Sequence, residues 1–222
     1  KRYGQALEAA QKAYSIDSTN VVARLELARA SFQNRDRPRA AALYAAITDT
    51  LQLKAEDYSR MGQLRLDEND LDGARLNFVT AVRQDSANAD AYYYMGFISV
   101  KRDSAENAIT SFRKAIEIDP ENPGYHLNLG IAQMRVKDKA GSIATLRRAS
   151  ELAPSSAQIR LYFAQALVSD STSAAIREYQ KARELEPDNV KVLLGLGLAY
   201  MTQKNYTLAI GILRDATQKE PG

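Results

Sequence analysis

Small and large apolar residues recur along the chain at a nearly constant spacing. A column of small residues repeats at intervals of 34, 34, 34, 34, 33 and 34: Ala6, Ala40, Ala74, Ala108, Ser142, Ala175 and Ala209. Four residues later comes a residue that is large in every block but the first: Ala10, Tyr44, Phe78, Phe112, Leu146, Tyr179 and Leu213. A third column follows the first by seven residues: Ala13, Ile47, Ala81, Ala115, Ala149, Ala182 and Ala216. Residues three and four apart share one face of an α-helix, so each block is predicted to contain a helix on which small residues adjoin a large one.

A further helix is predicted upstream of this one in each block after the first. It is marked by a large residue next to a small one: Leu27-Ala28, Met61-Gly62, Met95-Gly96, Leu129-Gly130, Phe163-Ala164 and Leu196-Gly197. A glycine inside a helix costs about 1 kcal/mol relative to alanine, so its recurrence indicates that two helices approach closely there. Short polar turns separate the two helices, and prolines close the later blocks at Pro120, Pro154, Pro187 and Pro221.

This pattern resembles the tetratricopeptide repeat, a helix–turn–helix unit of 34 residues. The best match reads Tyr92-x2-Met95-Gly96-x2-Ser99, then Ala108-x3-Phe112, then Pro120. The resemblance covers the whole chain and implies an all-α, right-handed superhelical solenoid of antiparallel helix hairpins. We expect a single array over residues 1–222, with a lone second helix at 1–20 followed by full repeats at 21–54, 55–88, 89–122, 123–156, 157–189 and 190–222. The fifth repeat has lost one residue in its turn at 169–173.

The resemblance also implies a binding surface, because in this family the first helices line a concave face that usually takes a peptide or a helix of a partner. Residues five, nine and twelve of each repeat share a helix face other than the one that carries the packing pair. In the last four repeats this row is Tyr93, Phe97, Val100, Leu127, Ile131, Met134, Leu161, Gln165, Val168, Leu194, Leu198 and Met201. Gln165 is its one polar member, whereas half of the row is polar in the first two repeats. We therefore hypothesise an apolar groove over residues 89–202, with a more polar mouth near Arg29, Arg60 and Gln63.

The candidate partner-binding residues are Tyr93, Tyr94, Phe97, Leu127, Asn128, Ile131, Leu161, Tyr162, Gln165, Leu194, Leu198, Arg60 and Gln63. Aromatic side chains that face a groove are typical binding anchors, because they bring a large contact area at a small entropic cost. The alternative is that the row packs against the neighbouring first helices, above all at its third position, which is apolar in all six repeats. A clamp for a C-terminal carboxylate, as some family members have, is not expected, since only Asn128 occupies a comparable place.

Composition narrows the candidate chemistry. The chain has no cysteine, which excludes disulfides and cysteine-ligated metal sites, and its one histidine, His126, excludes sites that need two. The net charge of +3 arises from 30 basic and 27 acidic residues, and no basic stripe indicates nucleic acid. The longest apolar run, at 192–201, is too short to cross a bilayer. We predict no catalytic, cofactor-binding or metal-binding residues and no direct membrane insertion.

The sequence is interpreted as a protein–protein interaction scaffold rather than an enzyme, with another protein as the partner. Two alternatives stay open: a regulatory or substrate-recruiting arm of a larger enzyme, and a structural or oligomerisation element of a larger complex. Neither end carries the polar cap that usually closes a solenoid, so both ends are expected to continue. The sequence names neither the partner nor the cellular compartment.

Overall fold

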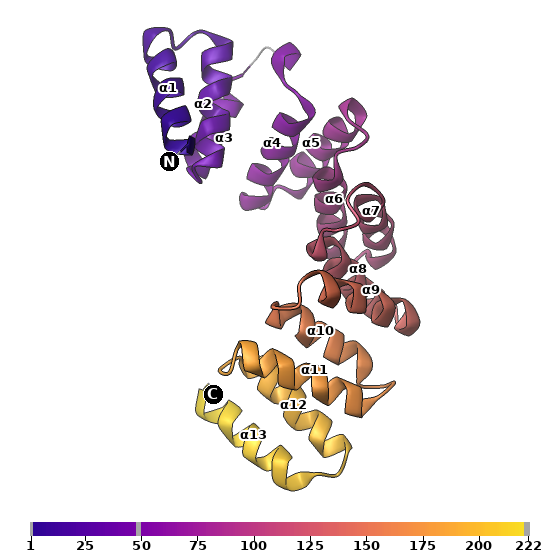
Figure 1. The fold of residues 1–222 in the computed structure, drawn as a ribbon. Helices are drawn as coiled ribbons and strands as arrows, with labels where there is room; N and C mark the ends of the chain where they lie inside the picture. Colours follow the sequence, from indigo (N-terminus) through magenta and orange to yellow (C-terminus); the bar gives the residue numbers. More distant parts are fainter. Residues whose placement is uncertain (1, 48–49, 220–222) are drawn as a thin grey trace. The chain divides into compact units, whose positions relative to one another are not determined.

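The computed structural model describes residues 2–47 and 50–219. Within them the chain forms thirteen α-helices and one 3-10 helix, η1, and no strand (Figure 1). The α-helices are α1 (Arg2–Ile16), α2 (Val21–Gln33), α3 (Arg37–Ala45), α4 (Ala55–Asp67), α5 (Leu71–Gln84), α6 (Ala89–Lys101), α7 (Ala105–Ile118), α8 (Pro123–Arg135), α9 (Lys139–Leu152), α10 (Ala157–Leu167), α11 (Thr172–Leu185), α12 (Val190–Thr202) and α13 (Tyr206–Lys219), with η1 at Thr50–Gln52. The predicted all-α class is confirmed.

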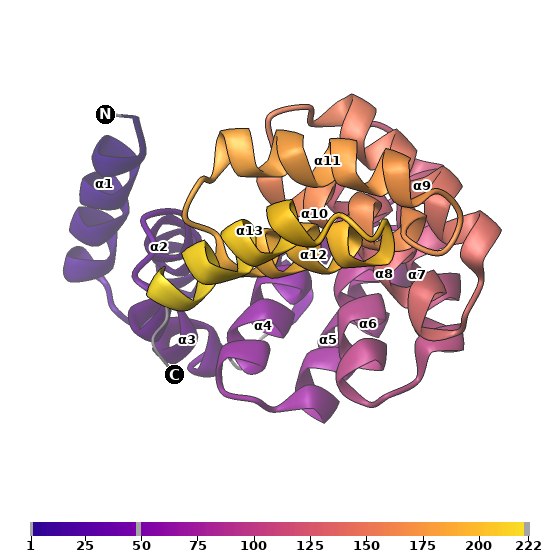
Figure 2. The same ribbon diagram turned by 90° about the horizontal axis from the view of Figure 1, so that it is seen from below.

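The helices divide into two compact units, residues 1–98 and 99–222, with the division inside α6. In the N-terminal unit α1 packs on α2, and α2 and α3 and then α4 and α5 form hairpins. In the C-terminal unit α7 packs on α8, and the hairpins α8–α9, α10–α11 and α12–α13 follow one another in contact. Figure 2 shows α10 to α13 as two successive antiparallel hairpins. The first helices from α2 to α12 begin at residues 21, 55, 89, 123, 157 and 190.

The hairpin turns share one backbone device. In five of the six described turns, the second residue after the first helix has a left-handed conformation: Arg35, Asn69, Asp103, Lys137 and Lys204. In the α8–α9 turn, the amide of Lys137 donates to the carbonyl of Met134 and the amide of Asp138 to that of Gln133, which is the Schellman arrangement. Asp138 then caps α9 by accepting from the amide of Gly141. In the repeat that lacks one residue, α10 has 11 residues where the other first helices have 13, and four residues rather than three join it to α11. None of these four is left-handed, so the deletion changes the helix end and the turn without removing the hairpin.

The small and large columns lie together on one face of each second helix, as predicted, and that face is buried from α3 onward. Every member of the small column from Ala40 onward is at most 2% exposed. The large column is buried to a similar degree at Tyr44, Phe78, Phe112, Leu146 and Tyr179. In α1, by contrast, Ala6 and Ala13 are exposed, since no first helix precedes α1 in the described residues. The columns are therefore buried by the partner helix of the same hairpin.

The helical glycines lie where this packing is tightest. A Cβ atom on Gly130 in α8 would lie 2.5 Å from Cγ of Leu146 in α9. On Gly62 it would lie 2.6 Å from the ring of Phe78, and on Gly197 2.6 Å from Leu213. Real Cβ atoms do not approach other heavy atoms so closely, so these glycines are required by helix–helix contact, as the sequence indicated. Gly211 on the exposed side of α13 has nothing within 4 Å of the corresponding point.

One second helix is shorter than the others. The helices α5, α7, α9, α11 and α13 each have 14 residues, whereas α3 has nine and ends at Ala45. The repeat register would carry α3 on to about residue 50, but Ile47, Thr48 and Thr50 are β-branched and Asp49 is also a poor helix former. Local helix propensity is therefore low where α3 would otherwise continue.

Gly130→Ala is expected to lower the free energy of unfolding by about 1–2 kcal/mol, because overpacking against Leu146 outweighs the better helix propensity of alanine. The matched control is Gly211→Ala, which is expected to raise it by up to about 1 kcal/mol, since that site has room. Urea unfolding followed by circular dichroism at 222 nm measures both. Stabilisation of equal size by the two changes would contradict the close approach.

Candidate functional site

The residues proposed from the sequence fall into both units. Arg60, Gln63, Tyr93, Tyr94 and Phe97 belong to the N-terminal unit, and the eight others belong to the C-terminal unit. The eight are Leu127, Asn128, Ile131, Leu161, Tyr162, Gln165, Leu194 and Leu198. Each unit therefore offers its own candidate surface.

The aromatic residues of α6 form a stacked cluster in the N-terminal unit. The ring of Tyr94 stacks on Phe78 of α5, with centroids 5.2 Å apart and planes 11° apart. Tyr93 meets the ring of Tyr94 edge to face at 5.1 Å. Burial, with a smaller contribution from Asp90, raises the pKa of Tyr94. Tyr94 thus anchors α6 to the packed Phe78, and Tyr93 and Phe97 are half-buried residues at the edge of this cluster.

The polar mouth is organised by a residue that the sequence analysis missed. The carboxylate of Asp57 is fully buried and accepts bonds from Arg29 Nε at 2.8 Å and Nη2 at 2.5 Å. Arg60 Nη1 and the Tyr44 hydroxyl also donate to it, at 3.0 and 3.1 Å. The backbone amide of Lys54 donates at 3.0 Å. The arginines proposed for the mouth therefore hold Asp57, which joins α2 and α3 to α4.

A signal for this network was present in the repeat register. The positions equivalent to Asp57 in later repeats are Ala91, Tyr125, Ile159 and Val192, and all of them are buried. A carboxylate in an apolar column is a buried charge, and buried charges occur with cationic and hydrogen-bonding partners. The partner Arg29 lies 28 residues away, on another helix, so the sequence pattern alone could not assign it.

A cleft lies beside this network, between α3 and α4. It has a volume of about 400 Å³ and is lined by Pro38, Ala41, Ala42, Tyr44, Ala45, Met61, Leu64, Arg65 and Glu68. Ala41 occupies the register position at which the next repeat has Arg75 and the four repeats after it have Ile109, Ile143, Ile176 and Ile210. The short α3 and the small side chain of Ala41 leave this joint less filled than those between hairpins of the C-terminal unit.

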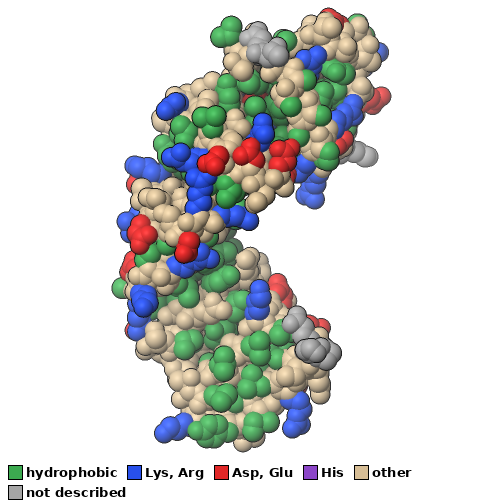
Figure 3. All heavy atoms as spheres, turned by 180° about the vertical axis from the view of Figure 1, so that it is seen from behind, with side chains coloured by type: hydrophobic (Ala, Val, Ile, Leu, Met, Phe, Trp, Pro, Cys, Tyr) green, Lys and Arg blue, Asp and Glu red, His purple; other side chains and the backbone are tan. Residues whose placement is uncertain are grey.

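In the C-terminal unit the predicted row changes from buried to exposed along the chain. Leu127 on α8 and Leu161 on α10 are only 7% and 5% exposed, because a further first helix packs beside each. Their equivalent on α12, Leu194, is 42% exposed, and Leu198 and Met201 on the same face are 58% and 44% exposed. We call Leu194, Leu198 and Met201 the α12 stripe. Figure 3 shows hydrophobic side chains gathered on the C-terminal hairpins, in the lower part of the view, with Lys and Arg at the margins.

The remaining row residues of the C-terminal unit differ in exposure. Ile131 and Tyr162 are half-buried and pack against the core, while Gln165 is exposed. Asn128 is half-buried, and its Nδ2 donates to the carbonyl of Gly124 at 2.9 Å. Leu127 and Leu161 thus pack between first helices, as the alternative to a binding groove predicts. Among the described apolar residues of the row in this unit, those of the α12 stripe are the most exposed.

A second depression adjoins the row where α8 ends. It has a volume of about 320 Å³ and is lined by Met134, Lys137, Lys139, Ser142, Gln165, Ala166 and Ser169. Met134 and Gln165 are also members of the predicted row, so the depression is continuous with it. We call it the turn pocket.

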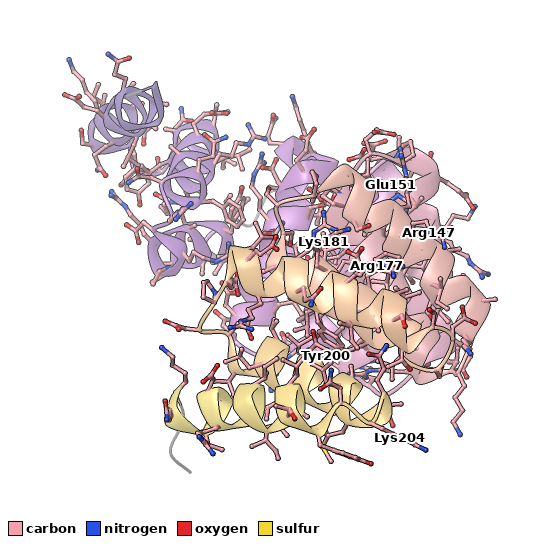
Figure 4. All side chains as sticks on the ribbon, turned by 60° about the horizontal axis from the view of Figure 1, so that its bottom comes forward. Arg147, Glu151, Arg177, Lys181, Tyr200 and Lys204 are labelled. Atoms are coloured by element: carbon pink, nitrogen blue, oxygen red, sulfur yellow. The ribbon has the colours of Figure 1, made fainter. Side chains whose placement is uncertain are left out.

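The outer faces of the second helices carry mixed charge. Figure 4 shows Arg147 and Glu151 projecting from α9, and Arg177 and Lys181 projecting from α11. Nearby, Arg160 Nη1 and Lys181 Nζ both pair with Glu178, at 2.7 and 2.8 Å. The two signs are interspersed over these helices.

The described residues contain no group of three or more His, Asp or Glu side chains that could hold a metal ion. His126 is buried, and its Nε2 bonds to the carbonyl of Pro120 at 2.8 Å. No described helix is long and apolar enough to cross a bilayer.

Three tetratricopeptide-repeat family models match the chain, at residues 1–61, 100–136 and 169–222. The chain is a tetratricopeptide-repeat protein. No curated protein matches it in sequence.

Solved structures of other tetratricopeptide-repeat proteins share the fold. YrrB, described as having an unusual peptide-binding site, is 24% identical, with a TM-score of 0.68 over 76% of this chain and 87% of that one. MamA from Desulfovibrio magneticus is 19% identical, with a TM-score of 0.70 over 75% and 95%. The C-terminal part of a repeat protein from Cytophaga hutchinsonii is 16% identical, with a TM-score of 0.73 over 99% and 91%.

The buried Asp57 makes this tetratricopeptide-repeat protein sensitive to acid. Burial by itself raises the pKa of the Asp57 carboxyl, but hydrogen bonds from Arg29 and Lys54, the charge of Arg29 and the Tyr44 hydroxyl outweigh burial, and the pKa is lowered. A carboxyl with a lowered pKa stabilises the folded state above its unfolded pKa, about 3.9. That contribution is lost as the pH falls below about 4, through the folded pKa.

Asp57→Asn is expected to lower the free energy of unfolding by about 3 kcal/mol at pH 7, because it leaves Arg29 and Arg60 without their buried counter-charge. The difference from the unsubstituted protein should shrink as the pH falls below about 4. Asp67→Asn is the control, since Asp67 is a half-exposed partner of Arg37 and its loss should change stability by less than about 1 kcal/mol. Urea unfolding at several pH values measures both. If Asp57→Asn lowers the free energy of unfolding only slightly, or by the same amount at every pH, the stabilising role of the ion pairs is contradicted.

Proposed function

We propose that this protein is an interaction scaffold whose C-terminal unit binds an apolar segment of a partner protein on the α12 stripe. Tetratricopeptide repeats form protein-interaction scaffolds, and this chain has that architecture. The observation that carries the proposal is that, within residues 1–222, Leu194, Leu198 and Met201 are exposed on one face of α12, which no first helix of the described residues covers. Their spacing of four and three residues makes them a continuous strip along the helix.

The strip suits a partner helix or extended peptide on physical grounds. Single exposed hydrophobic residues are ordinary on protein surfaces, but a contiguous set indicates an interaction surface. Complete burial of a leucine or methionine side chain contributes about 1.5–3 kcal/mol. The three side chains of the stripe are already about half buried by the protein itself, so a partner buries only the remainder. Three of them together support moderate affinity, which polar contacts at the edge can increase. The description of YrrB as having a peptide-binding site agrees with this use of the fold.

A second candidate surface is the edge of the aromatic cluster on α6. Tyr93 and Phe97 are half-buried and large, and the stacking of Tyr94 on Phe78 fixes the helix that carries them. Rigid aromatic side chains lose little conformational entropy on binding. We assign Tyr93 and Phe97 a role in partner binding, independent of the α12 stripe.

Leu198→Glu is expected to weaken peptide binding at least tenfold, because a charge replaces an apolar contact. The probes are peptides selected from a displayed library of random 12-residue sequences on residues 1–222, then measured by fluorescence anisotropy. Leu208→Glu is the matched control, since Leu208 is an exposed leucine on α13 of the same unit.

Thermal unfolding should change little in either leucine variant, because both side chains are about half exposed. Equal binding by Leu198→Glu and the unsubstituted protein would overturn the use of the stripe. Sedimentation over a range of concentrations tests the alternative of an oligomerisation element. A concentration-dependent mass that Leu198→Glu abolishes would assign the stripe to a second copy of the chain instead.

Some selected peptides are expected to bind Leu198→Glu as tightly as the unsubstituted protein. Replacing both Tyr93 and Phe97 by alanine is expected to abolish binding of these peptides, with little change in melting temperature. The control is Tyr92→Ala, a half-buried tyrosine on the same helix outside the predicted row. A large drop in melting temperature with binding intact would show that the two residues serve packing alone.

A further inference from the structure

The turn pocket stands at the one polar interruption of the predicted row. In the repeats on either side, the position of Gln165 is occupied by Ile131 and Leu198. Gln165 is exposed and lines the pocket together with Met134, another member of the row. The fold does not require a polar residue at this position, because the adjacent repeats place aliphatic residues there. The exception therefore needs a local explanation.

Lys137 is the second polar residue with spare bonding capacity in the pocket. It is exposed, and the side chains of Lys137 and Gln165 have no hydrogen bond or ion pair to the described residues. The corresponding turn positions hold Arg35, Asn69, Asp103 and Lys204, so a lysine is not a requirement of the turn. Its backbone is fixed by the Schellman bonds, with φ of 61°. The side chain of Lys137 thus starts from a fixed backbone position at the pocket that Gln165 also lines.

The other charged groups of this region are already engaged. Lys139 Nζ donates to the carbonyl of Ser169 at 2.9 Å and lies 3.6 Å from Oδ1 of Asp170. The carboxylate of Asp138 accepts from the amide of Gly141 and from Gln133 Nε2, at 2.9 and 3.2 Å. Two lysines and two aspartates balance in this region, and among the lysines that line the pocket Lys139 is already paired with Asp170. Lys137 is therefore the charged donor of the lining that remains available to a ligand.

We propose that the turn pocket binds the side-chain carboxylate of an aspartate or glutamate in the partner segment. This rests on the proposed function, because the apolar residues of the same segment would lie on the α12 stripe. The Lys137 ammonium and the Gln165 amide donate to the carboxylate oxygens, and Met134 and Ala166 contact its methylene groups. The pocket adjoins α10, which packs between α8 and α12, so a bound segment continues on both sides of it. A side-chain carboxylate fits such a segment better than a chain terminus does.

The partner chemistry that follows is an apolar peptide with an acidic residue. A charge-assisted hydrogen bond contributes about 1.5–3 kcal/mol, which corresponds to about tenfold or more in affinity. Peptides selected on residues 1–222 are therefore expected to contain aspartate or glutamate more often than the unselected library. Replacing that residue by asparagine or glutamine is expected to weaken binding about tenfold.

The test uses the selected peptides, each synthesised with a free and with an amidated C-terminus, and three protein variants. Lys137→Glu is expected to weaken binding of the acidic peptides at least tenfold and to leave their neutralised forms little changed. Lys204→Glu is the matched control, because Lys204 has the same left-handed turn conformation, with φ of 60°, in another hairpin. Gln165→Leu restores the apolar row and is expected to reduce the preference for the acidic form over the neutral one.

The outcomes separate this inference from the proposed function. If Leu198→Glu weakens peptide binding and Lys137→Glu binds as tightly as Lys204→Glu, the carboxylate site in the turn pocket is overturned and binding on the α12 stripe is retained. Dependence on neither Leu198 nor Lys137 overturns both. Loss of binding on amidation alone overturns the assignment to a side-chain carboxylate. The inference is supported if Lys137→Glu and neutralisation of the peptide's acidic residue each weaken binding, and Lys204→Glu binds as tightly as the unsubstituted protein.

Discussion

Close contact between a small residue of one helix and a large residue of its partner is the constraint on which this structure depends. Gly130 can lie against Leu146 only because it has no side chain, and the same relation holds between Gly62 and Phe78. Each hairpin is held by this contact, and its outer faces are left to pack on the next hairpin. The described residues therefore form separate hydrophobic clusters, two in the N-terminal unit and one in the C-terminal unit.

Because neighbouring hairpins bury each other, local sequence differences have local consequences. In the N-terminal unit, α3 ends early and position 41 holds alanine where the last four repeats have isoleucine, and a cleft lies at the joint with α4. The buried Asp57 links the helices on both sides of that joint through Arg29, Tyr44 and Arg60. An ionic network thus joins two hairpins where apolar packing is reduced.

The same logic connects packing to the proposed binding surface. Leu127, Leu161 and Leu194 occupy equivalent places, yet only Leu194 is substantially exposed, since no first helix in the described residues covers it. We propose that such a face binds a partner segment where it lies open. In this proposal Gln165 and Lys137 add selectivity for an acidic residue next to that face, because neither position is needed for packing.

The repeat length, the start of each first helix and the glycine contacts follow from the sequence, because the 34-residue period and the pairing of small with large residues are local patterns. The sequence predicted the candidate surface only in part, because the helical period indicates which residues share a helix face but not whether a neighbouring helix covers that face. Leu127 and Leu194 are alike in sequence terms and differ in exposure. Asp57 finds partners on two other helices, Arg29 on α2 and Tyr44 on α3, and Arg29 is 28 residues away in the sequence. Tertiary structure decided these points, because burial and ion pairing depend on which distant helices meet.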